Sequence, residues 1–211
     1  MIKKQYIIKE IFYSLQGEGM HSGTPAIFVR FSGCNLWSGR EEDRINAICK
    51  FCDTDFVGYD GENGGKYLLH ELVGLLNDIR SETKCKFLIF TGGEPTLQID
   101  EKLIDELHKE EFFISLETNG TNDVLEGIDW ITVSPKYGST LKQNHGNELK
   151  LVFPQDDLNP NIFMSLDFDN YYLQPKESLE YDDNLKLCLD YCLQNPDWKL
   201  SLQTHKYLNI K

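Results

Sequence analysis

The sequence is poor in positive charge and has no long apolar run. Its 211 residues include 21 Lys and Arg against 34 Asp and Glu, which gives a formal net charge of -13. Because a chain this acidic is repelled by phosphate backbones, its composition argues against binding to bulk nucleic acid. A small polar ligand held in a pocket is still compatible with this charge. No stretch approaches the roughly 18–20 apolar residues that a membrane helix needs.

A signal peptide is not expected either, because Lys9 and Glu10 interrupt the apolar run near the N-terminus. We therefore expect a cytoplasmic protein without a membrane partner, in which thiols stay reduced. Its six cysteines are then expected to be metal ligands or core residues rather than disulfides. The sequence also lacks repeats, low-complexity tracts and linkers. With 40% hydrophobic residues, a single domain over residues 1–211 is the resulting expectation.

Short apolar strands alternate with helical patterns along the chain. Apolar residues at helical spacing predict helices over residues 67–80, 99–110 and 184–195. Strands are predicted at residues 26–31, within 86–91, and at 112–120, 129–136, 147–153, 170–175 and 198–208. This order predicts an α/β fold with a mostly parallel sheet.

Polar clusters follow five of the predicted strands. They are Cys34–Asn35, Thr91–Glu94, Glu117–Asn119, Ser134–Lys136 and Gln174–Lys176. Each cluster by itself is equally compatible with an ordinary turn. Because the carboxyl ends of parallel strands meet at one edge of a sheet, the five together favour a single shared ligand site.

Three of the cysteines lie in one polar loop. Cys49 and Cys52 form a Cys-x-x-Cys pair, and Cys34 stands fourteen residues upstream of it. The pair alone also occurs in zinc sites and redox motifs, although no helical pattern starts between the two cysteines as thioredoxin-like chemistry requires. Three thiolates also fit a four-iron cluster with one iron left open. The spacing therefore leaves zinc and an iron–sulfur cluster both open.

The other cysteines are predicted to be structural. Cys188 and Cys192 lie one helical turn apart on an apolar face, and Cys85 stands beside the start of a strand. A zinc site could recruit Cys85, His21 or His70 as its fourth ligand, but none of them shows the paired spacing of a zinc ribbon.

The cysteine loop and the later "TGGEP" (91–95) together resemble the radical S-adenosylmethionine (SAM) superfamily. Within that superfamily, seven further stretches are similar to the 7-carboxy-7-deazaguanine synthase family. They are "FYSLQGEG", "RFSGCNLW", "CKFCDTDF", "LETNGT", "VSPK", "YYLQP" and "LSLQTHKYL", and they span residues 12–208. The superfamily commonly has three residues between its first two cysteines, but this family includes members with the longer loop. The resemblance implies an incomplete (β/α) barrel with abbreviated helices, and residues 131–153 indeed show no convincing helical pattern.

The resemblance also implies a reaction. Members of the family convert 6-carboxy-5,6,7,8-tetrahydropterin to 7-carboxy-7-deazaguanine with loss of ammonia, in queuosine and 7-deazapurine biosynthesis. The implied cofactors are a [4Fe–4S] cluster, SAM and Mg²⁺, with a 5′-deoxyadenosyl radical removing hydrogen from the substrate. No side chain is then expected to carry acid–base catalysis, since the cofactor carries the chemistry. The implied partners are a second copy of the chain and a reductant such as flavodoxin or ferredoxin.

The residues that match the family's motifs receive its roles by resemblance. Cys34, Cys49 and Cys52 would bind the cluster, and Thr54 would bind Mg²⁺, although by sequence alone Asp53 or Asp55 is the better cation ligand. The residues implied for SAM are Phe51, Asp53, Gly93, Glu94, Glu117, Ser134, Pro135, Lys136 and Gln174. The residues implied for the substrate are Leu15, Gln16, Gly17, Glu18, Arg30, Thr91 and His205.

Three of these roles carry a specific chemical expectation. The guanidinium of Arg30 is suited to a substrate carboxylate. The carboxylate of Glu18 is suited to amino and ring N–H donors, and that of Glu94 to the ammonium group of SAM. Family members often place a C-terminal carboxylate or proline near the substrate, whereas this sequence has Lys211 there. The role of Lys211 stays open.

Two other functions compete with this interpretation. A radical SAM activase, which generates a glycyl radical on a partner protein, would share the cluster but would not need "SLQGEG" or Arg30. A zinc-binding interaction module would have no use for Gly-Gly-Glu-Pro and the polar strand ends. Purified protein would be brown with iron and colourless with zinc.

Overall fold

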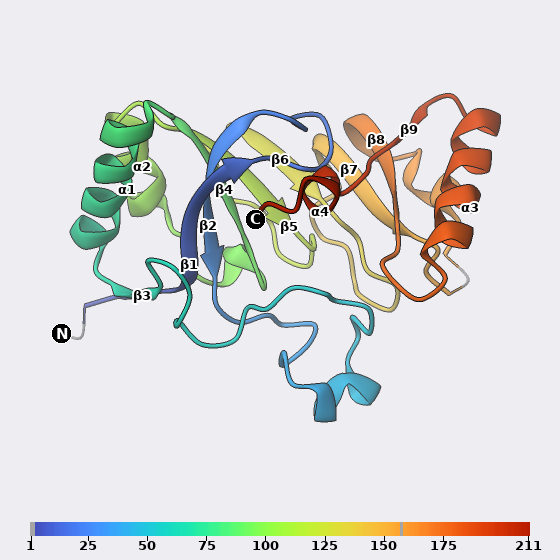
Figure 1. Cartoon of the computed structure of the whole chain (residues 1–211), viewed down its shortest axis with the longest axis horizontal. Helices are drawn as coiled ribbons and strands as arrows, with labels where there is room; N and C mark the ends of the chain where they lie inside the picture. The colour runs from blue at the N-terminus through green and yellow to red at the C-terminus, as the bar shows by residue number, and fades with distance from the viewer. Residues whose placement is uncertain (1–2, 157) are drawn as a thin grey trace.

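A computed structural model describes residues 3–156 and 158–211, which form one sheet of nine strands (Figure 1). The strand order is β3–β1–β2–β4–β5–β6–β7–β8–β9. The strands are β1 (Tyr6–Leu15), β2 (Pro25–Phe31), β3 (Gly65–Tyr67), β4 (Phe87–Gly92), β5 (Phe113–Thr118), β6 (Trp130–Val133), β7 (His145–Phe153), β8 (Asp167–Pro175) and β9 (Trp198–Leu200). β1 is antiparallel to β2 and β3, and every pairing from β2 to β9 is parallel.

Helices cover the outer face of this curved sheet at its two ends. They are α1 (Leu69–Thr83), α2 (Glu101–Lys109) and α3 (Tyr181–Gln194), whereas the short α4 (Thr204–Leu208) lies at the cavity, on the loop between β1 and β2. In Figure 1, α1 and α2 lie at one end of the sheet and α3 at the other. The mixed α/β class, the mostly parallel sheet and the incomplete barrel are confirmed. None of the described helices is both long enough and apolar enough to cross a lipid bilayer.

Local sequence explains where the first two long helices begin and end. Asp100 caps α2 by accepting a hydrogen bond from the backbone N–H of Leu103 at 3.0 Å. α1 ends at Lys84, whose φ of 62° is left-handed and stops the helical repeat. Leu72 and Leu76 of α1 are fully buried, and burying each such side chain contributes about 1.5–3 kcal/mol.

Three segments differ from the predicted elements. Residues 6–15 form β1 and residues 65–67 form β3, two strands that the sequence did not predict. The prediction of a strand over residues 198–208 is wrong in its second half, because only Trp198–Leu200 is a strand and Thr204–Leu208 is the helix α4. The backbone N–H of Thr204 donates to the carbonyl of Gly17 at 2.9 Å. This contact directs the segment onto the loop between β1 and β2 instead of along the sheet. The predicted absence of a helix between β6 and β7 is confirmed, as these residues are all described.

Alternation along the strands separates a core face from a cavity face. In β2, Ile27 and Val29 join the core beneath α1 and α2, so Arg30 between Val29 and Phe31 points to the opposite face. By the same alternation, Leu149 and Leu151 of β7 join the core beside α3. Lys150, which stands between them, therefore faces inward.

Candidate functional site

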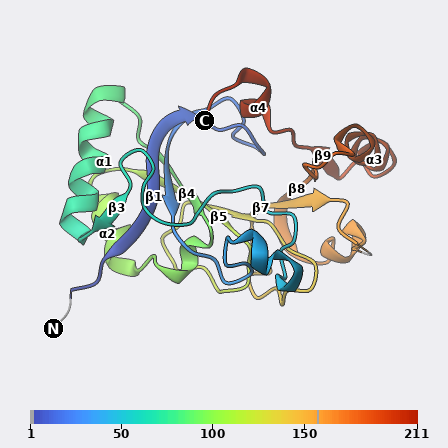
Figure 2. The ribbon, with the colours of Figure 1, turned by 60° about the horizontal axis from the view of Figure 1, so that its bottom comes forward.

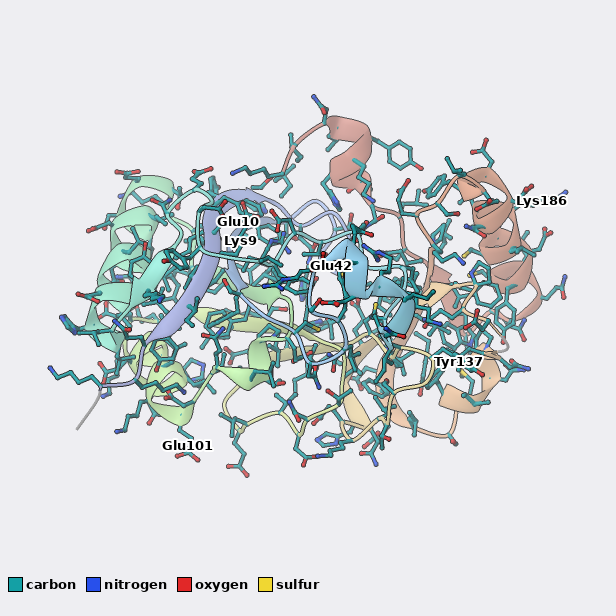
Figure 3. All side chains as sticks on the ribbon, turned by 90° about the horizontal axis from the view of Figure 1, so that it is seen from below. Lys9, Glu10, Glu42, Glu101, Tyr137 and Lys186 are labelled. Atoms are coloured by element: carbon teal, nitrogen blue, oxygen red, sulfur yellow. The ribbon has the colours of Figure 1, made fainter. Side chains whose placement is uncertain are left out.

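A cavity of about 460 Å³ lies at the carboxyl ends of the parallel strands. All five polar clusters predicted to share one site contribute lining residues, as do the cysteine loop and the C-terminal segment. Figure 3 views the molecule from the side of the cysteine loop, with Glu42 on this loop and Glu10 on β1. The cavity is therefore enclosed by segments from both ends of the chain.

The three loop cysteines all line this cavity as free thiols. Burial raises the pKa of the Cys34 thiol. The interaction between the neighbouring Cys49 and Cys52 thiols raises the pKa of Cys49 and lowers that of Cys52 to about 6. One thiolate, the form that binds metals, is thus favoured at neutral pH.

A buried lysine holds two carboxylates together on the inner wall of the sheet. Lys150 on β7 has a side chain that is only 6% exposed, and its Nζ pairs with Glu18 and, at 3.4 Å, with Oε1 of Glu117. Burial opposes ionisation of Glu18, but the charge of Lys150 outweighs this effect and brings the pKa of Glu18 down to about 2. Glu18 is therefore held as an anion, and both carboxylates lie beside one ammonium group.

Neutral side chains complete the wall. Gln16 Nε2 donates to Glu117 Oε1 at 3.0 Å, and the Thr91 hydroxyl donates to Glu117 Oε2 at 3.0 Å. Gln203 Nε2 donates to Glu18 Oε1 at 2.8 Å. These contacts connect the loop after β1, the end of β4 and the segment before α4. The wall is thus a hydrogen-bonded network rather than a set of separate side chains.

Arg30 lies on the β2 side of the cavity and is oriented by a carboxylate. Its Nε donates to Glu10 Oε1 at 2.9 Å, and the two side chains are 20% and 19% exposed. Within the described residues, its two terminal guanidinium nitrogens have no hydrogen-bond partner. They are the edge that a bidentate carboxylate would use.

His205 on α4 closes the cavity from the C-terminal side. A Cβ added to Gly17 would lie 2.1 Å from His205 Nδ1, so only glycine allows this close approach. The Thr204 hydroxyl also donates to the Gly17 carbonyl at 3.0 Å. Figure 2 shows α4 and the C-terminus beside the end of β1. The Ser14 hydroxyl accordingly donates to the carbonyl oxygen of Lys211 at 2.7 Å, and Lys211 lines the cavity.

Comparison with known proteins identifies relatives of this fold and site. The crystal structure of QueE from Escherichia coli aligns with a TM-score of 0.72 at 28% identity, over 94% of this chain and 93% of that one. Residues 44–148 match the model of the radical SAM superfamily. The 7-carboxy-7-deazaguanine synthases of Burkholderia multivorans and Caulobacter vibrioides are 53% and 51% identical to this chain, each over 97% of this chain and 99% of the relative. The chain belongs to the 7-carboxy-7-deazaguanine synthase family.

Membership of this family decides between zinc and an iron–sulfur cluster in favour of the cluster, with SAM as its partner. The residues present fit both groups. Three free thiols from one loop open onto the same cavity, which is the donor set of a three-cysteine cluster. A Cβ on Gly93 would lie 2.0 Å from the carbonyl oxygen of Gly33. The Gly-Gly turn of this synthase-family chain therefore packs directly against the start of the cysteine loop.

Two residues expected to contact SAM, Glu94 and Pro135, are not among the residues that line the cavity, and their contact with SAM stays a prediction. Glu94 is fully buried, and its carboxylate accepts hydrogen bonds from the backbone N–H of Thr96 and Asn119 and from the hydroxyls of Thr96 and Thr118. Both of its oxygens therefore already accept hydrogen bonds from the protein. Pro135 is buried as well, and its carbonyl accepts from Gln155 Nε2 at 3.2 Å.

The other residues expected at the site in this synthase-family chain all line the cavity. They are Cys34, Cys49, Cys52, Thr54, Phe51, Asp53, Gly93, Glu117, Ser134, Lys136, Gln174, Leu15, Gln16, Gly17, Glu18, Arg30, Thr91 and His205. Sequence reasoning missed Glu10, Lys150 and Gln203. A charged residue inside the apolar strand pattern of "NELKLVF" was the available signal for Lys150. Glu10 and Gln203 carry no comparable signal, because exposed Glu and Gln are common on strands and loops.

Proposed function

We propose that this protein converts 6-carboxy-5,6,7,8-tetrahydropterin to 7-carboxy-7-deazaguanine with loss of ammonia, as a radical SAM lyase of queuosine and 7-deazapurine biosynthesis. The observation that carries the proposal is the composition of one cavity. Free thiols line one part of it, and another part presents two carboxylates paired with Lys150 and a free guanidinium edge. The 53% identity to a synthase with this name supports the substrate and the product.

Cys34, Cys49 and Cys52 would hold the cluster, and Gly93, Ser134 and Gln174 line the part of the cavity assigned to SAM. When bound, these two groups supply one-electron cleavage of SAM to a 5′-deoxyadenosyl radical. Lys136 lies in the same region, where its Nζ donates to the carbonyl and hydroxyl oxygens of Ser134 at 2.6 and 2.7 Å. Burial lowers the pKa of Lys136, and a nearby carboxylate or sulfide charge would favour its ammonium form.

The substrate is a flat heterocycle with a carboxylate at one end and N–H donors at the other. We assign the carboxylate to the free edge of Arg30, and the N–H donors to Glu18 and Glu117, whose anionic form accepts hydrogen bonds. The stacked rings of Phe12 and Phe28, 5.0 Å between centroids, supply the apolar surface that a flat ring covers. The role of these side chains is orientation and exclusion of water rather than proton transfer.

The proposal includes Mg²⁺ at Thr54. Of the three oxygen-bearing residues in "DTD", Asp53 pairs with Lys206 at 2.9 Å and Asp55 with Lys9 at 2.8 Å. In the described part of the chain, the Thr54 hydroxyl has no hydrogen-bond partner, and it lines the cavity. This arrangement supports Thr54 over its neighbours as the protein ligand, with the substrate carboxylate as a second hard oxygen donor.

Four further parts complete the proposal. They are a single domain over residues 1–211, a cytoplasmic location, a homodimer, and reduction by flavodoxin or ferredoxin. The single sheet, with helices packed on its outer face, supports the first of these.

Mass spectrometry of one anaerobic reaction tests the function. It would contain reconstituted protein, SAM, a reductant, Mg²⁺ and 6-carboxytetrahydropterin, with Cys49→Ala as the control. The expected result is a new mass for 7-carboxy-7-deazaguanine that the control lacks. Formation of 5′-deoxyadenosine alone would show that the substrate is wrong. If neither product forms from cluster-loaded protein, the synthase proposal fails and the activase becomes the working hypothesis.

A further inference from the structure

The loop between Cys34 and Cys49 is organised around Arg44. This residue lies in a 3₁₀ turn, Glu41–Asn46, in which no side chain is buried, so apolar burial does not determine the shape of the turn. The guanidinium of Arg44 instead stacks on Trp37, 3.9 Å from the centroid of its ring. Trp37 is only 7% exposed and packs edge-on against Phe56 at 5.6 Å. The indole is therefore a fixed platform for the arginine.

The hydrogen bonds of Arg44 reach from this turn to the Cys-x-x-Cys pair. Nε and Nη2 donate to the two carboxylate oxygens of Glu41, at 2.7 and 2.5 Å. Nη1 donates to the carbonyl oxygens of Lys50 and Cys52, at 3.0 and 3.1 Å. Four of the five N–H donors of the guanidinium are thus used. The planar fork reaches three groups at once, which the ammonium of a lysine cannot do in this geometry.

The other side of the cysteine pair is held by the backbone. The N–H groups of Ile48 and Cys49 donate to the carbonyl oxygen of Leu36 at 3.0 and 3.2 Å. The N–H of Leu36 donates in turn to Cys34 Sγ at 3.4 Å. Leu36 therefore fixes Cys34 and the start of the pair, and Arg44 fixes its end. These two residues therefore contact the Cys34 sulfur and the backbone of Cys49 and Cys52.

We propose that Arg44 is a positioning residue for the cluster, which holds the Cys49–Cys52 turn in the conformation that binds iron. The inference rests on the proposed ligation by the three cysteines. It also gives the long loop between Cys34 and Cys49 a function, since this loop supplies the three side chains that interact at Arg44. They are Glu41, Arg44 and Trp37. Partners that orient metal ligands typically change metal affinity by about 10–100-fold when they are removed.

The test compares Arg44→Lys and Arg44→Gln with Arg40→Gln after anaerobic reconstitution. Arg40 is a matched control in the same loop, because its side chain is 70% exposed and its nearest carboxylate is 3.9 Å away. The measurements are iron and sulfide per chain, the rate of iron loss to a ferrous chelator, and the electron paramagnetic resonance spectrum of the reduced cluster. We expect both Arg44 variants to lose iron about 10–100-fold faster than the wild type and to show a broadened signal. Arg40→Gln should match the wild type.

The outcomes separate this proposal from its alternatives. Wild-type iron loss and an unchanged spectrum in Arg44→Gln would overturn it. Wild-type behaviour of Arg44→Lys alone would also overturn it, because charge rather than the fork would then be sufficient.

Thermal unfolding of the cluster-free Arg44 variants should match the wild type, since the turn buries no side chain. If Arg44→Gln does not fold, Glu41→Gln loosens the same clamp from a carboxylate that is 75% exposed, and it should also lose iron faster. A wild-type protein that binds no iron would refute the cluster ligation instead.

Discussion

The charge of Lys150 is the residue-scale feature with the largest expected effect. Replacing it with methionine leaves Glu18 and Glu117 without their buried counter-ion, and such a loss typically costs about 3–5 kcal/mol of folding free energy. Lys199→Met is the control, because Lys199 is exposed and its side chain donates, among the described residues, a single hydrogen bond, to the side chain of Asn170. Urea unfolding at pH 7 measures both variants. A loss in Lys150→Met no larger than that of the control would contradict the role of the ion pair.

The same variant carries a pH prediction. In the wild type the pKa of Glu18 lies at about 2, below its unfolded value, so the stability it contributes is present above roughly pH 4.3 and is lost as the pH falls toward 2. In Lys150→Met, the largest opposing charge is gone, and burial, the largest cause, outweighs the smaller effects of Gln203 and His205 and raises the pKa of Glu18. Protonation of Glu18 then removes the buried unpaired charge and stabilises the variant, whereas Glu18 of the wild type stays ionised in this pH range. The stability difference between them should therefore narrow as the pH falls from 7 to about 4.5. A constant difference would contradict this account of Glu18.

Glu94 leads to a stability prediction where the sequence had suggested a ligand. In Glu94→Gln, an amide N–H₂ replaces one oxygen and meets the donors of Thr96, Thr118 or Asn119. Leaving buried donors unpaired typically costs about 1–3 kcal/mol. Urea unfolding should show this loss, whereas Glu82→Gln, on the exposed end of α1, should not. Unchanged stability would mean that the network tolerates the amide.

At this scale, residue types predicted the cavity well and the packing of single side chains poorly. Cys34, Arg30 and Glu117 were placed correctly in one cavity because their strands or loops end at the same edge of the sheet. Glu94 follows its strand in the same way, but its carboxylate turns toward the strand ends of β4 and β5 and is satisfied there. Which oxygen finds a donor depends on neighbours far apart in sequence, and a pattern of residue types does not contain that information.

At the scale of elements, α4 depends on the absence of a side chain at Gly17. In Gly17→Ala the new methyl would meet His205 Nδ1 at 2.1 Å and the His205 backbone nitrogen at 2.9 Å, so α4 must move. Overpacking of this kind costs about 1–3 kcal/mol, and we expect a tenfold or larger rise in KM for the pterin, about 1.4 kcal/mol. Gly74→Ala, whose methyl meets nothing within 4 Å, is the control. An unchanged KM would mean that α4 does not help to bind the substrate.

The elements that were missed share one cause. Residues 6–15 contain β-branched and aromatic side chains, but Lys9 breaks the apolar pattern although it is only 8% exposed. Its burial becomes possible only because Asp55 and Asp60 pair with it from the cysteine loop. Residues 204–208 form a helix because they dock on Gly17. In both cases a distant contact outweighs the local pattern, whereas α1 and α2 were predictable from their own periodicity.

At the scale of the whole molecule, the parallel part of the sheet from β2 to β9 was predictable, and the curvature that closes the cavity was not. The alternation of strands and helices already implied a parallel sheet with its ligand site at the carboxyl ends of the strands. The closing contacts join Gly17 to Thr204 and Ser14 to Lys211, which are nearly the full chain apart. Sequence spacing carries little information about such pairings. The sequence therefore predicts the part of the cavity formed by the strand ends. The part closed by the C-terminal segment becomes apparent only in the folded structure.

This layout gives the molecule two determinants of binding that should be separable. The three thiols belong to a loop outside the buried core clusters, whereas Arg30, Glu18 and Glu117 lie on the sheet and its first loop. A variant with all three cysteines changed to alanine should therefore fold and bind 6-carboxypterin, the oxidised fluorescent analogue of the substrate, with nearly wild-type affinity. Arg30→Met should weaken the same binding by about tenfold or more, since a charged hydrogen bond contributes about 1.5–3 kcal/mol. Fluorescence titration measures both, and an equal loss in the two variants would show that the cysteine loop must be ordered by its cluster before the pterin can bind.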